Sequence, residues 1–179
     1  KKLLEESGWT DTDGDGYVDK DGEKLSINWL TYPTRLEQPK LAEYAQSTLK
    51  DIGIDVQVNN TSDHMTIAKS GDFDVYVSST TTAPTGDPEY FFTSTVTGAK
   101  NYGNYQNEEV TKLTDQLHQT FDKDERAKLA VELQQDILDD DAFFFVSHLN
   151  MGIVTKSNVT GMAAHPCDYY EITADLDVE

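Results

Sequence analysis

The chain has 179 residues and 37% hydrophobic residues, which fits one ordinary domain built around one core. It carries 14 basic and 33 acidic residues, a formal net charge of −19, so it repels phosphate backbones and excludes nucleic acid as a main partner. The single cysteine, Cys167, excludes an internal disulfide framework. No apolar run reaches the roughly 18 residues of a membrane span. The chain opens on KKLLEESGW without an initiator Met, so we expect a segment cut from a longer protein.

The first half of the chain alternates helix and strand patterns. Leu25, Ile27 and Trp29 alternate with polar residues, which is the period of a half-buried strand. From residue 41, apolar or small residues recur every three or four positions, which is the period of a helix. We expect a helix at 1–7 closed by Gly8, strands at 25–29, 54–58 and 73–77, and helices at 37–52, ended by Gly53, and at 62–70, with Ser62 or Asp63 as its N-cap.

This order of elements predicts an α/β fold. Short right-handed β-α-β connections favour a sheet with parallel strand pairs and helices packed on it. In such sheets, ligands bind in loops beyond the carboxyl ends of the strands. The two loops at that end are Thr31–Glu37 and the long, hydroxyl-rich Ser78–Glu89. We therefore expect ligand contacts in these two loops.

The second half reads mainly as helix. Asp87 and Pro88 predict an N-cap followed by a first helical residue. Apolar stripes predict helices at about 107–120 and 124–139, the second capped by Asp124. The apolar run FFFV at 143–146 predicts a strand covered on both faces, with a partner strand at 151–155.

The acidic run DTDGDGYVDKD at residues 11–21 has the alternating carboxylates of an EF-hand-like calcium loop, with Gly16 at its tight point. The bidentate Glu expected at the twelfth position is replaced by Gly22. Two interpretations stay open: a weak structural Ca²⁺ site, or an acidic surface turn. The first also raises the alternative of a Ca²⁺-dependent bacterial surface or adhesion module. The candidate ligands are Asp11, Asp13, Asp15, Tyr17 and Asp19.

No catalytic signature is present. The chain has no G-x-S-x-G, HExxH, GxxxxGK[ST] or CxxC pattern, and its four histidines lack metal-ligand spacing. We therefore predict that the protein is not an enzyme and needs no cofactor. We expect His64 and His118 at the surface, His148 at a strand edge, and Cys167 as a half-buried thiol or a reactive one.

A binding role fits the loops better. Arg35 follows a predicted strand, where its guanidinium could fork onto a ligand carboxylate or pair with Glu37 or Glu43. Aromatic side chains in the later loops could line a cleft or pack beneath the loops. These residues are Tyr90, Tyr102 and Tyr105.

Several long runs resemble the C-terminal lobe of family 5 extracellular solute-binding proteins, the peptide- and nickel-binding receptors of ABC importers. The resemblance covers nearly the whole chain and is carried by KKLLEESGWTDTDGDGYVDKDGEKL, LTYPTRLEQPKLAEYAQSTLKDIGIDVQV, GDFDVYV, APTGDPEYFF and VSHLNMGIVTKSNVTGMAAHPCDYY. It implies a lobe of the type II periplasmic-binding-protein kind, formed by residues 1–179, with the first lobe outside this chain. It also implies a lipoprotein or periplasmic protein that captures cargo between two lobes and delivers it to a membrane permease.

The cargo implied by the resemblance is nickel, a nickel chelate or a short peptide. APTGDPEYFF and HPCDYY are closer to the nickel branch, in which a histidine can touch the metal complex. His165 is the candidate for that contact, and a histidine fixed in a turn by Pro166 is the alternative. The full set of expected ligand contacts is Tyr32, Arg35, Thr82, Tyr90, Tyr102 and His165.

Overall fold

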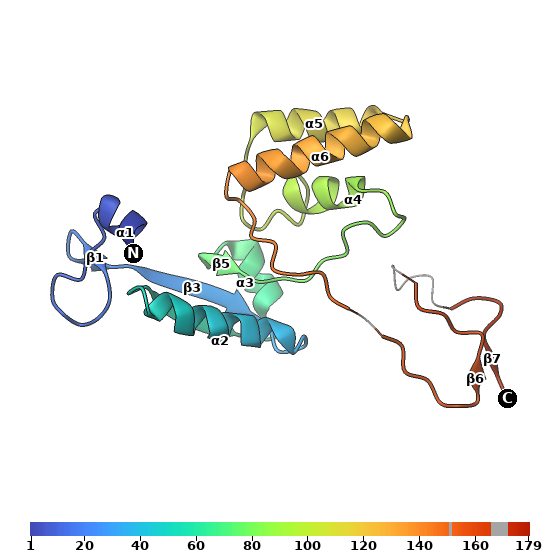
Figure 1. Ribbon diagram of the computed structural model, residues 1–179, viewed down its shortest axis with the longest axis horizontal. Helices are drawn as coiled ribbons and strands as arrows, with labels where there is room; N and C mark the ends of the chain where they lie inside the picture. The colour runs from blue at the N-terminus through green and yellow to red at the C-terminus, as the bar shows by residue number, and fades with distance from the viewer. Residues whose placement is uncertain (151, 166–171) are drawn as a thin grey trace. The chain divides into compact units, whose positions relative to one another are not determined.

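The computed structural model describes residues 1–150, 152–165 and 172–179. The chain divides into two compact units, Lys1–Ser79 (unit 1) and Thr80–Glu179 (unit 2). Unit 1 alternates strands and helices (Figure 1): α1 (Lys2–Glu6), β1 (Asp19–Lys20), β2 (Glu23–Lys24), β3 (Ser26–Thr31), α2 (Glu37–Lys50), β4 (Asp55–Asn60), α3 (His64–Ser70) and β5 (Val75–Tyr76). Unit 2 contains α4 (Glu89–Phe91), the π-helix η1 (Phe92–Val96), α5 (Glu108–Gln119), α6 (Lys123–Asp139), β6 (Val159–Thr160) and β7 (Asp177–Val178).

Unit 1 has a three-stranded parallel sheet in the order β4-β3-β5, which confirms the predicted α/β fold with parallel strand pairs. The central strand β3 pairs with β4 along its whole length and with β5 at only two positions. The strand predicted at 73–77 is therefore shorter than expected. At its start the Asp74 N–H donates to the Asn28 carbonyl at 2.9 Å, while the Asn28 N–H donates to the Asp74 side chain at 2.7 Å and not to a backbone carbonyl.

The helices of unit 1 begin and end within two residues of their predicted positions. α2 packs against β4 and buries Ala42, while Leu30 and Val56 fill the sheet side of this core. α2 ends before Gly53, whose φ of +89° is a left-handed conformation that glycine adopts at low cost. Asp63 occupies the N-cap position of α3, as one of the two predicted alternatives had it, although its side chain accepts no capping hydrogen bond.

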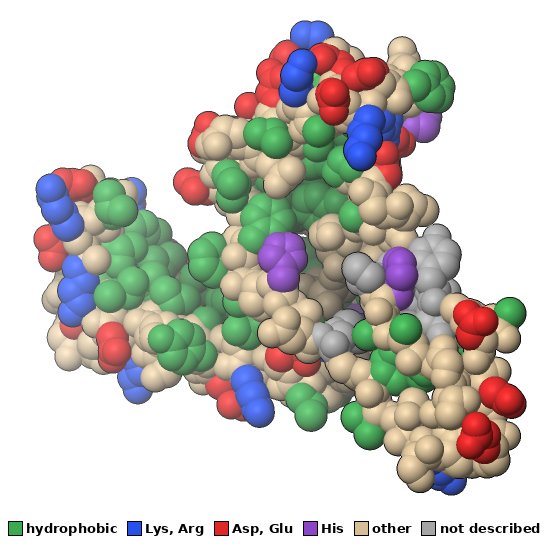
Figure 2. All heavy atoms as spheres, turned by 45° about the vertical axis from the view of Figure 1, so that its right-hand side comes forward, with side chains coloured by type: hydrophobic (Ala, Val, Ile, Leu, Met, Phe, Trp, Pro, Cys, Tyr) green, Lys and Arg blue, Asp and Glu red, His purple; other side chains and the backbone are tan. Residues whose placement is uncertain are grey.

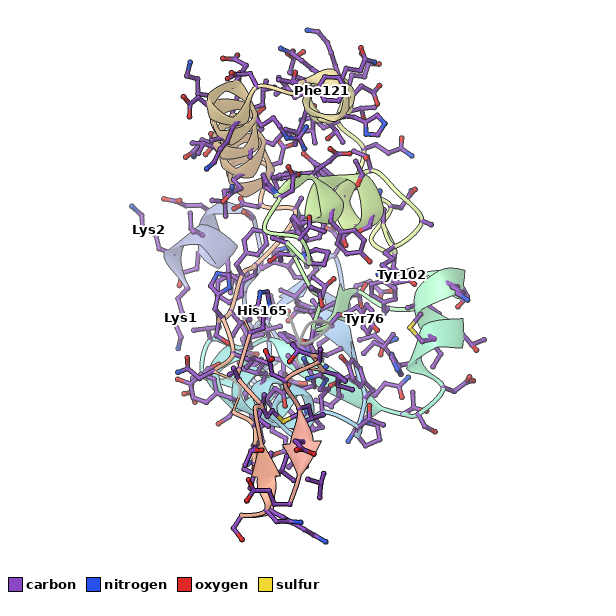
Figure 3. The ribbon with its side chains drawn as sticks, turned by 90° about the vertical axis from the view of Figure 1, so that its right-hand side faces the viewer. Lys1, Lys2, Tyr76, Tyr102, Phe121 and His165 are labelled. Carbon is purple, nitrogen blue, oxygen red and sulfur yellow. The ribbon has the colours of Figure 1, made fainter. Side chains whose placement is uncertain are left out.

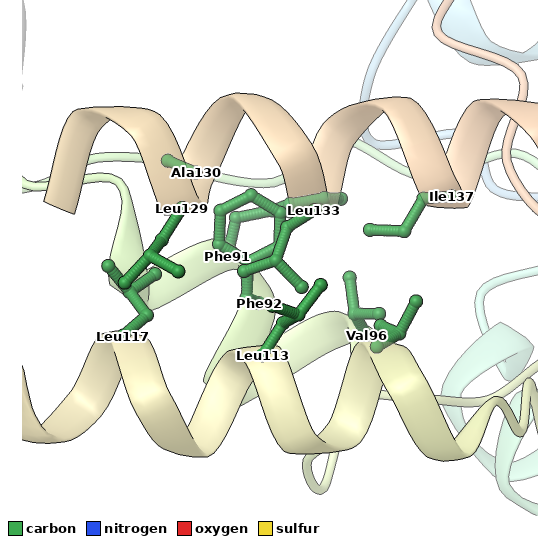
Figure 4. Packing of buried hydrophobic residues seen from close by; sticks show 10 residues of the cluster. Phe91, Phe92, Val96, Leu113, Leu117, Leu129, Ala130, Leu133 and Ile137 are labelled. Atoms are coloured by element: carbon green, nitrogen blue, oxygen red, sulfur yellow. The ribbon is translucent and has the colours of Figure 1, made fainter. Parts of the chain in front are cut away.

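Unit 2 is organised around a helical hairpin formed by α5 and α6, which pack side by side (Figure 1). Each helix has a side-chain N-cap, Asn107 for α5 and Asp122 for α6. The prediction that Asp124 caps α6 was wrong. The helix begins at Lys123, and the residue before it, Asp122, has the extended backbone and the capping side chain. Figure 4 shows the core between the two helices and α4–η1: Phe91, Phe92, Val96, Val110, Leu113, Leu117, Leu129, Ala130, Leu133 and Ile137.

The helix after Asp87 starts one residue later than predicted. Pro88 occupies the N-cap position and α4 begins at Glu89, but the Asp87 carboxylate still accepts the Glu89 N–H at 2.9 Å. The chain then continues directly into η1. Asp87 therefore performs the capping role that the sequence indicated, from one position further out.

The strands predicted at 143–146 and 151–155 were wrong for the residues described. Residues 143–150 and 152–155 belong to no strand, and residue 151 lies outside the described ranges. The tail contains a short antiparallel pair, β6–β7, which the sequence analysis did not predict. A covered strand needs partner strands, and this run has none among the residues described.

Charged side chains cover the helices of unit 2 (Figure 2). Short-range pairs such as Lys112 with Glu109 and Lys128 with Glu125 lie along these helices, and all four side chains are largely exposed. Among the residues described, no helix combines the length and the apolar character that crossing a membrane requires.

Candidate functional site

The carboxyl edge of the unit 1 sheet is the candidate binding site. From central β3 the chain passes through the loop at 32–36 and α2 to β4 on one side, and through α3 it then reaches β5 on the other. Such a change of direction is the topological switch point where open α/β sheets bind ligands. The loops that leave β3 and β5 here are the two loops that the sequence singled out.

Three ring side chains lie at this edge. The ring of Tyr32 stacks on His64 with centroids 4.1 Å apart and planes inclined by 17°. His64 Nδ1 lies 2.8 Å from the hydroxyl of Tyr76, which projects from β5 (Figure 3). The Tyr32 hydroxyl accepts the backbone N–H of Ser79 at 3.3 Å. These contacts join the loop after β3, the start of α3 and the loop after β5.

These contacts change the interpretation of two residues. His64 was expected at the surface but is half-buried and belongs to this stack. Tyr32, an expected ligand contact, is only 7% exposed, so within unit 1 it supports the loops from beneath more than it presents a free ring. A ligand at this edge would contact the loops that surround Tyr32, while the Tyr32 ring would hold those loops in place through His64 and Ser79.

Two buried polar atoms lie in the same region. Thr31 Oγ1, at the end of β3, and Gln38 Oε1, in the first turn of α2, are both enclosed and accept or donate no hydrogen bond among the residues described. Buried polar atoms in proteins nearly always have a hydrogen-bond partner. The carboxyl edge of β3 therefore retains hydrogen-bonding capacity that the protein's own described side chains do not use.

Arg35 lies in the loop after β3 and is exposed. Among the described residues its side chain makes no ion pair or hydrogen bond, so the predicted alternative of a pair with Glu37 or Glu43 is not what the structure shows. An exposed guanidinium without a carboxylate partner keeps all five of its N–H donors available. The chemistry that fits it is a planar, bidentate anion such as a carboxylate.

The expected contacts in unit 2 lie on its loops and on α4. Thr82 is exposed in the loop after β5, and Tyr90 on α4 is 37% exposed. The Lys100 ammonium donates to the Tyr90 hydroxyl at 3.0 Å and lies 5.3 Å from its ring centroid. Tyr102 is half-buried. Tyr90 thus presents a ring whose hydroxyl already has a cationic partner.

Tyr105 has a structural role, which was one of its two predicted alternatives. Its ring packs edge-on against Phe143 at 6.2 Å, beside the helical core. Its hydroxyl donates to Asp140 at 2.6 Å, and Asn107 donates to the same carboxylate oxygen at 2.7 Å. Burial, helped by the Asp140 hydrogen bond, raises the pKa of Tyr105 to about 12.

His165 and His148 are both exposed, and His148 is not at a strand edge, because its segment forms no strand. Figure 3 labels His165 in the C-terminal part of the chain. Cys167 and the HPCDYY run beyond His165 lie outside the described residues.

Sequence reasoning missed Arg126 on α6, which makes five hydrogen bonds among the described residues. Its guanidinium forks onto both oxygens of Asp87 at 2.7 and 2.9 Å and also donates to Glu89 at 2.7 Å. Its remaining donors reach the carbonyls of Leu117 and Thr120, which close α5. The Arg126 hydrogen bonds hold the pKa of Asp87 and of Glu89 below their usual values.

His118 extends this network. Its Nδ1 lies 2.5 Å from the second oxygen of Glu89, so this exposed histidine, expected to be solvated, has a carboxylate partner. The network joins the end of the loop after β5 to α4, α5 and α6. Asp87-Pro88 was the only sequence signal near it, and nothing in the local pattern linked that dipeptide to a residue 39 positions away.

The acidic loop brings the carboxylates of Asp11, Asp13 and Asp15 together, with one oxygen of each within 4.8 Å of the others. All three are exposed, and their oxygens accept backbone N–H groups of the same loop. The Lys24 ammonium lies 2.5 Å from Asp15 and lowers the pKa of that carboxyl, as does the Tyr17 N–H. Asp19 is engaged by Thr12. The loop is thus stabilised by its own donors, as an acidic surface turn would be.

Comparison with known proteins identifies relatives along most of the chain. The family model described as "Bacterial extracellular solute-binding proteins, family 5 Middle" matches residues 1–103. The chain is 30% identical over 178 residues to the oligopeptide-binding protein AppA of Bacillus subtilis, and 28% identical over 168 residues to the nickel-binding protein NikA of Staphylococcus aureus. These matches cover 96% and 92% of this chain but 33% and 34% of the relatives, so the chain spans about a third of their length.

Solved structures agree with these matches. The structure of Bacillus subtilis AppA in complex with a nonapeptide aligns with a TM-score of 0.80 and 28% identity, over 94% of this chain and 35% of that chain. Staphylococcus aureus NikA in complex with Ni(L-His)2 aligns with a TM-score of 0.75 and 25% identity, over 99% of this chain and 37% of that chain. The resemblance read from the sequence is confirmed.

Proposed function

The chain belongs to the family 5 bacterial extracellular solute-binding proteins, and from this premise we propose that it forms the C-terminal lobe of a receptor that captures cargo outside the cytoplasm for an ABC importer. The remaining lobe lies outside these 179 residues, and closure of the two lobes buries the cargo. A membrane permease then receives it. The relatives above are both named as binding proteins.

We propose that the cargo is a short peptide or a nickel–amino acid complex, recognised in part through a carboxylate. AppA is named for oligopeptides and NikA for nickel, with Ni(L-His)2 in its solved complex, and both kinds of ligand present amino acid carboxylates. Support comes from one observation above all: the exposed guanidinium of Arg35, beside the carboxyl edge of the sheet, pairs with no side chain in the described part of the chain. Thr82, Tyr90, Tyr102 and His165 are proposed as further contacts.

Calorimetry on the full-length receptor tests this proposal with Ni²⁺ alone, Ni²⁺ with L-histidine, and mixed peptides. Arg35→Gln should weaken binding of the preferred ligand about 10- to 100-fold, because a hydrogen-bonded charge pair contributes on the order of 1.5–3 kcal/mol. Lys40→Gln is the matched control, because Lys40 is exposed on α2 and the substitution removes the same charge from the same unit. Equal affinities of the two variants would refute the role of Arg35.

Two outcomes would reject the wider proposal. A full-length receptor that binds neither class of ligand is not the predicted importer component. Nanomolar binding by these 179 residues alone would contradict a site shared between two lobes. Anchoring as a lipoprotein is a further expectation, checked by metabolic labelling of the full-length protein with a fatty acid.

The family of the chain does not favour the alternative of a Ca²⁺-dependent adhesion module, and the Lys24 ammonium already pairs with Asp15 in the acidic loop. A thermal melt with and without Ca²⁺ distinguishes the Ca²⁺-dependent module from the solute-binding receptor. Saturating a site at 100 times its Kd would stabilise the protein by about 2.7 kcal/mol, which is readily visible as a rise in Tm. We expect no such rise.

A further inference from the structure

His64 contacts two different strands' ends at the carboxyl edge of the unit 1 sheet. It is the first residue of α3 and is half-buried. The ring of Tyr32, the first residue after β3, stacks on its imidazole with centroids 4.1 Å apart. The hydroxyl of Tyr76, the last residue of β5, lies 2.8 Å from its Nδ1. One side chain on α3 therefore links the start of the loop after β3 to the end of β5.

The link continues into the start of the loop after β5. The sheet pairs β3 with β5 only at Trp29–Val75 and Leu30–Tyr76, and the Val77 N–H then donates to the Leu30 carbonyl at 3.1 Å. Beyond that point the Ser79 N–H donates to the hydroxyl of the same Tyr32 ring that stacks on His64. A short strand pairing is thus extended at this edge by side chains.

The platform that carries His64 is a packed helix. α3 contacts β3, and its Ala68 is 1% exposed, so the helix is held against the sheet one turn beyond His64. A functional site keeps its geometry when the residues behind it are fixed by packing and hydrogen bonds on a regular element. His64 meets this condition for both loops.

We propose that His64 is a positioning residue for cargo: it sets the loop after β3, which carries Arg35, relative to the start of the loop after β5. This inference rests on the proposed function, because those loops are the proposed cargo contacts. His64 acts through Tyr32 and Tyr76 and does not touch cargo itself. Loops that must be ordered during binding lower affinity, and a joint that orders them beforehand removes that loss.

The two contacts of His64 can be removed separately. His64→Phe keeps a ring that can stack on Tyr32 but has no nitrogen for the Tyr76 hydroxyl. His64→Asn keeps a polar group close to the position of Nδ1 but has no ring. The test varies His64 because the Tyr76 hydroxyl also lies 3.9 Å from Met65 Sδ, so a substitution of Tyr76 would change more than one contact.

Calorimetry on the full-length receptor, with peptides and with Ni²⁺ plus L-histidine, measures the effect on affinity. His64→Ala should weaken binding about 10-fold, the scale on which one ring contact and one hydrogen bond act together. His64→Phe and His64→Asn should each recover part of that loss. Unchanged affinity in His64→Ala, or no recovery by either variant, would overturn the proposal.

Gly53→Ala is the matched control for a loss of stability alone. Gly53 lies between α2 and β4, at the amino edge of the same sheet, where an added Cβ would lie 2.9 Å from a Val18 side-chain carbon. This variant should be less stable but should bind cargo as wild type does, at a temperature well below its Tm. Equal weakening of binding in Gly53→Ala and His64→Ala would assign the effect to general destabilisation and overturn the positioning role.

Hydrogen exchange on the cargo-free, full-length receptor separates this inference from the proposed function. The Ser79 amide should exchange about 10-fold faster in His64→Ala than in wild type, because its acceptor on Tyr32 loses the stacked ring, and should be unchanged in Gly53→Ala. Unchanged Ser79 exchange in His64→Ala would reject the positioning role. A wild-type receptor that binds neither class of ligand would reject the proposed function instead.

Discussion

Replacing Arg126 with Gln should destabilise unit 2, because this guanidinium holds three segments together. The guanidinium is only 15% exposed and makes five hydrogen bonds of 2.6–2.9 Å, to two carboxylates and to two carbonyls at the end of α5. Its loss would leave Asp87 and Glu89 as neighbouring like charges. It would also leave the carbonyls of Leu117 and Thr120 without these donors.

The magnitude follows from burial. Breaking a fully buried ion pair costs about 3–5 kcal/mol, but the Asp87 side chain is 40% exposed and water would replace part of what it loses. We therefore expect Arg126→Gln to lower the free energy of unfolding by about 2–3 kcal/mol. Arg126→Lys keeps the charge without the fork and should recover about half of the loss.

Urea denaturation at pH 7 measures these differences. Lys128→Gln, on the same helix, is the control: its exposed pair with Glu125 should contribute less than about 0.5 kcal/mol. A loss below about 0.5 kcal/mol for Arg126→Gln would show that this network is no stronger than an ordinary surface pair.

The pH dependence provides a second test. Because Arg126 lowers the folded-state pKa of Asp87 and of Glu89, the stability they contribute is present above the ordinary carboxyl range near pH 4 and is lost as the pH falls through the lowered values. The stability difference between wild type and Arg126→Gln should therefore shrink as the pH is lowered from 7 towards 3. A difference that stays constant over this range would contradict the assignment.

Two further predictions concern other contacts. Tyr105→Phe should lower the free energy of unfolding by about 1 kcal/mol at pH 8, because the hydrogen bond to Asp140 is lost. The folded-state pKa of Tyr105 is raised to about 12, so urea melts should show this difference shrinking as the pH rises from 10 towards 12. A difference that does not change with pH would contradict the prediction. Gly53→Ala should lower the free energy of unfolding by about 1–3 kcal/mol, because φ is +89° and the new Cβ would lie 2.9 Å from a Val18 side-chain carbon. Gly14→Ala is the control: φ is +82° but no atom lies within 4 Å, so only the smaller conformational cost should appear. Equal losses for the two variants in thermal melts would argue against the steric contact with Val18.

The sequence predicted the local elements of this fold well, because their signals are local. The apolar stripe of α2 and the alternation along β3 placed both elements within two residues, and Gly53 marked the end of α2 through its own backbone preference. The same patterns predicted the parallel sheet and the two loops at its carboxyl edge. They could not show that Tyr32 is buried under His64, since that contact depends on packing between elements.

Arg126 illustrates a second limit. Its partners lie 39, 37, 9 and 6 residues away, so no periodicity or short motif contains the network. In the sequence, Arg126 stands in the first turn of a helix next to acidic residues, where an ordinary solvent-exposed pair would be expected. Only the three-dimensional return of Asp87 and Glu89 to the start of α6 reveals its role.

Residues 142–150 show why helices are easier to predict than strands in a chain that spans part of its relatives. A helix satisfies its backbone hydrogen bonds within itself, so α5 and α6 form here as the sequence predicts. A strand needs a neighbouring strand for the same groups, and the FFFV run has none among the residues described. The strand prediction at 143–146 is therefore wrong for this chain, because the pattern favours a strand but no described residue pairs with its backbone.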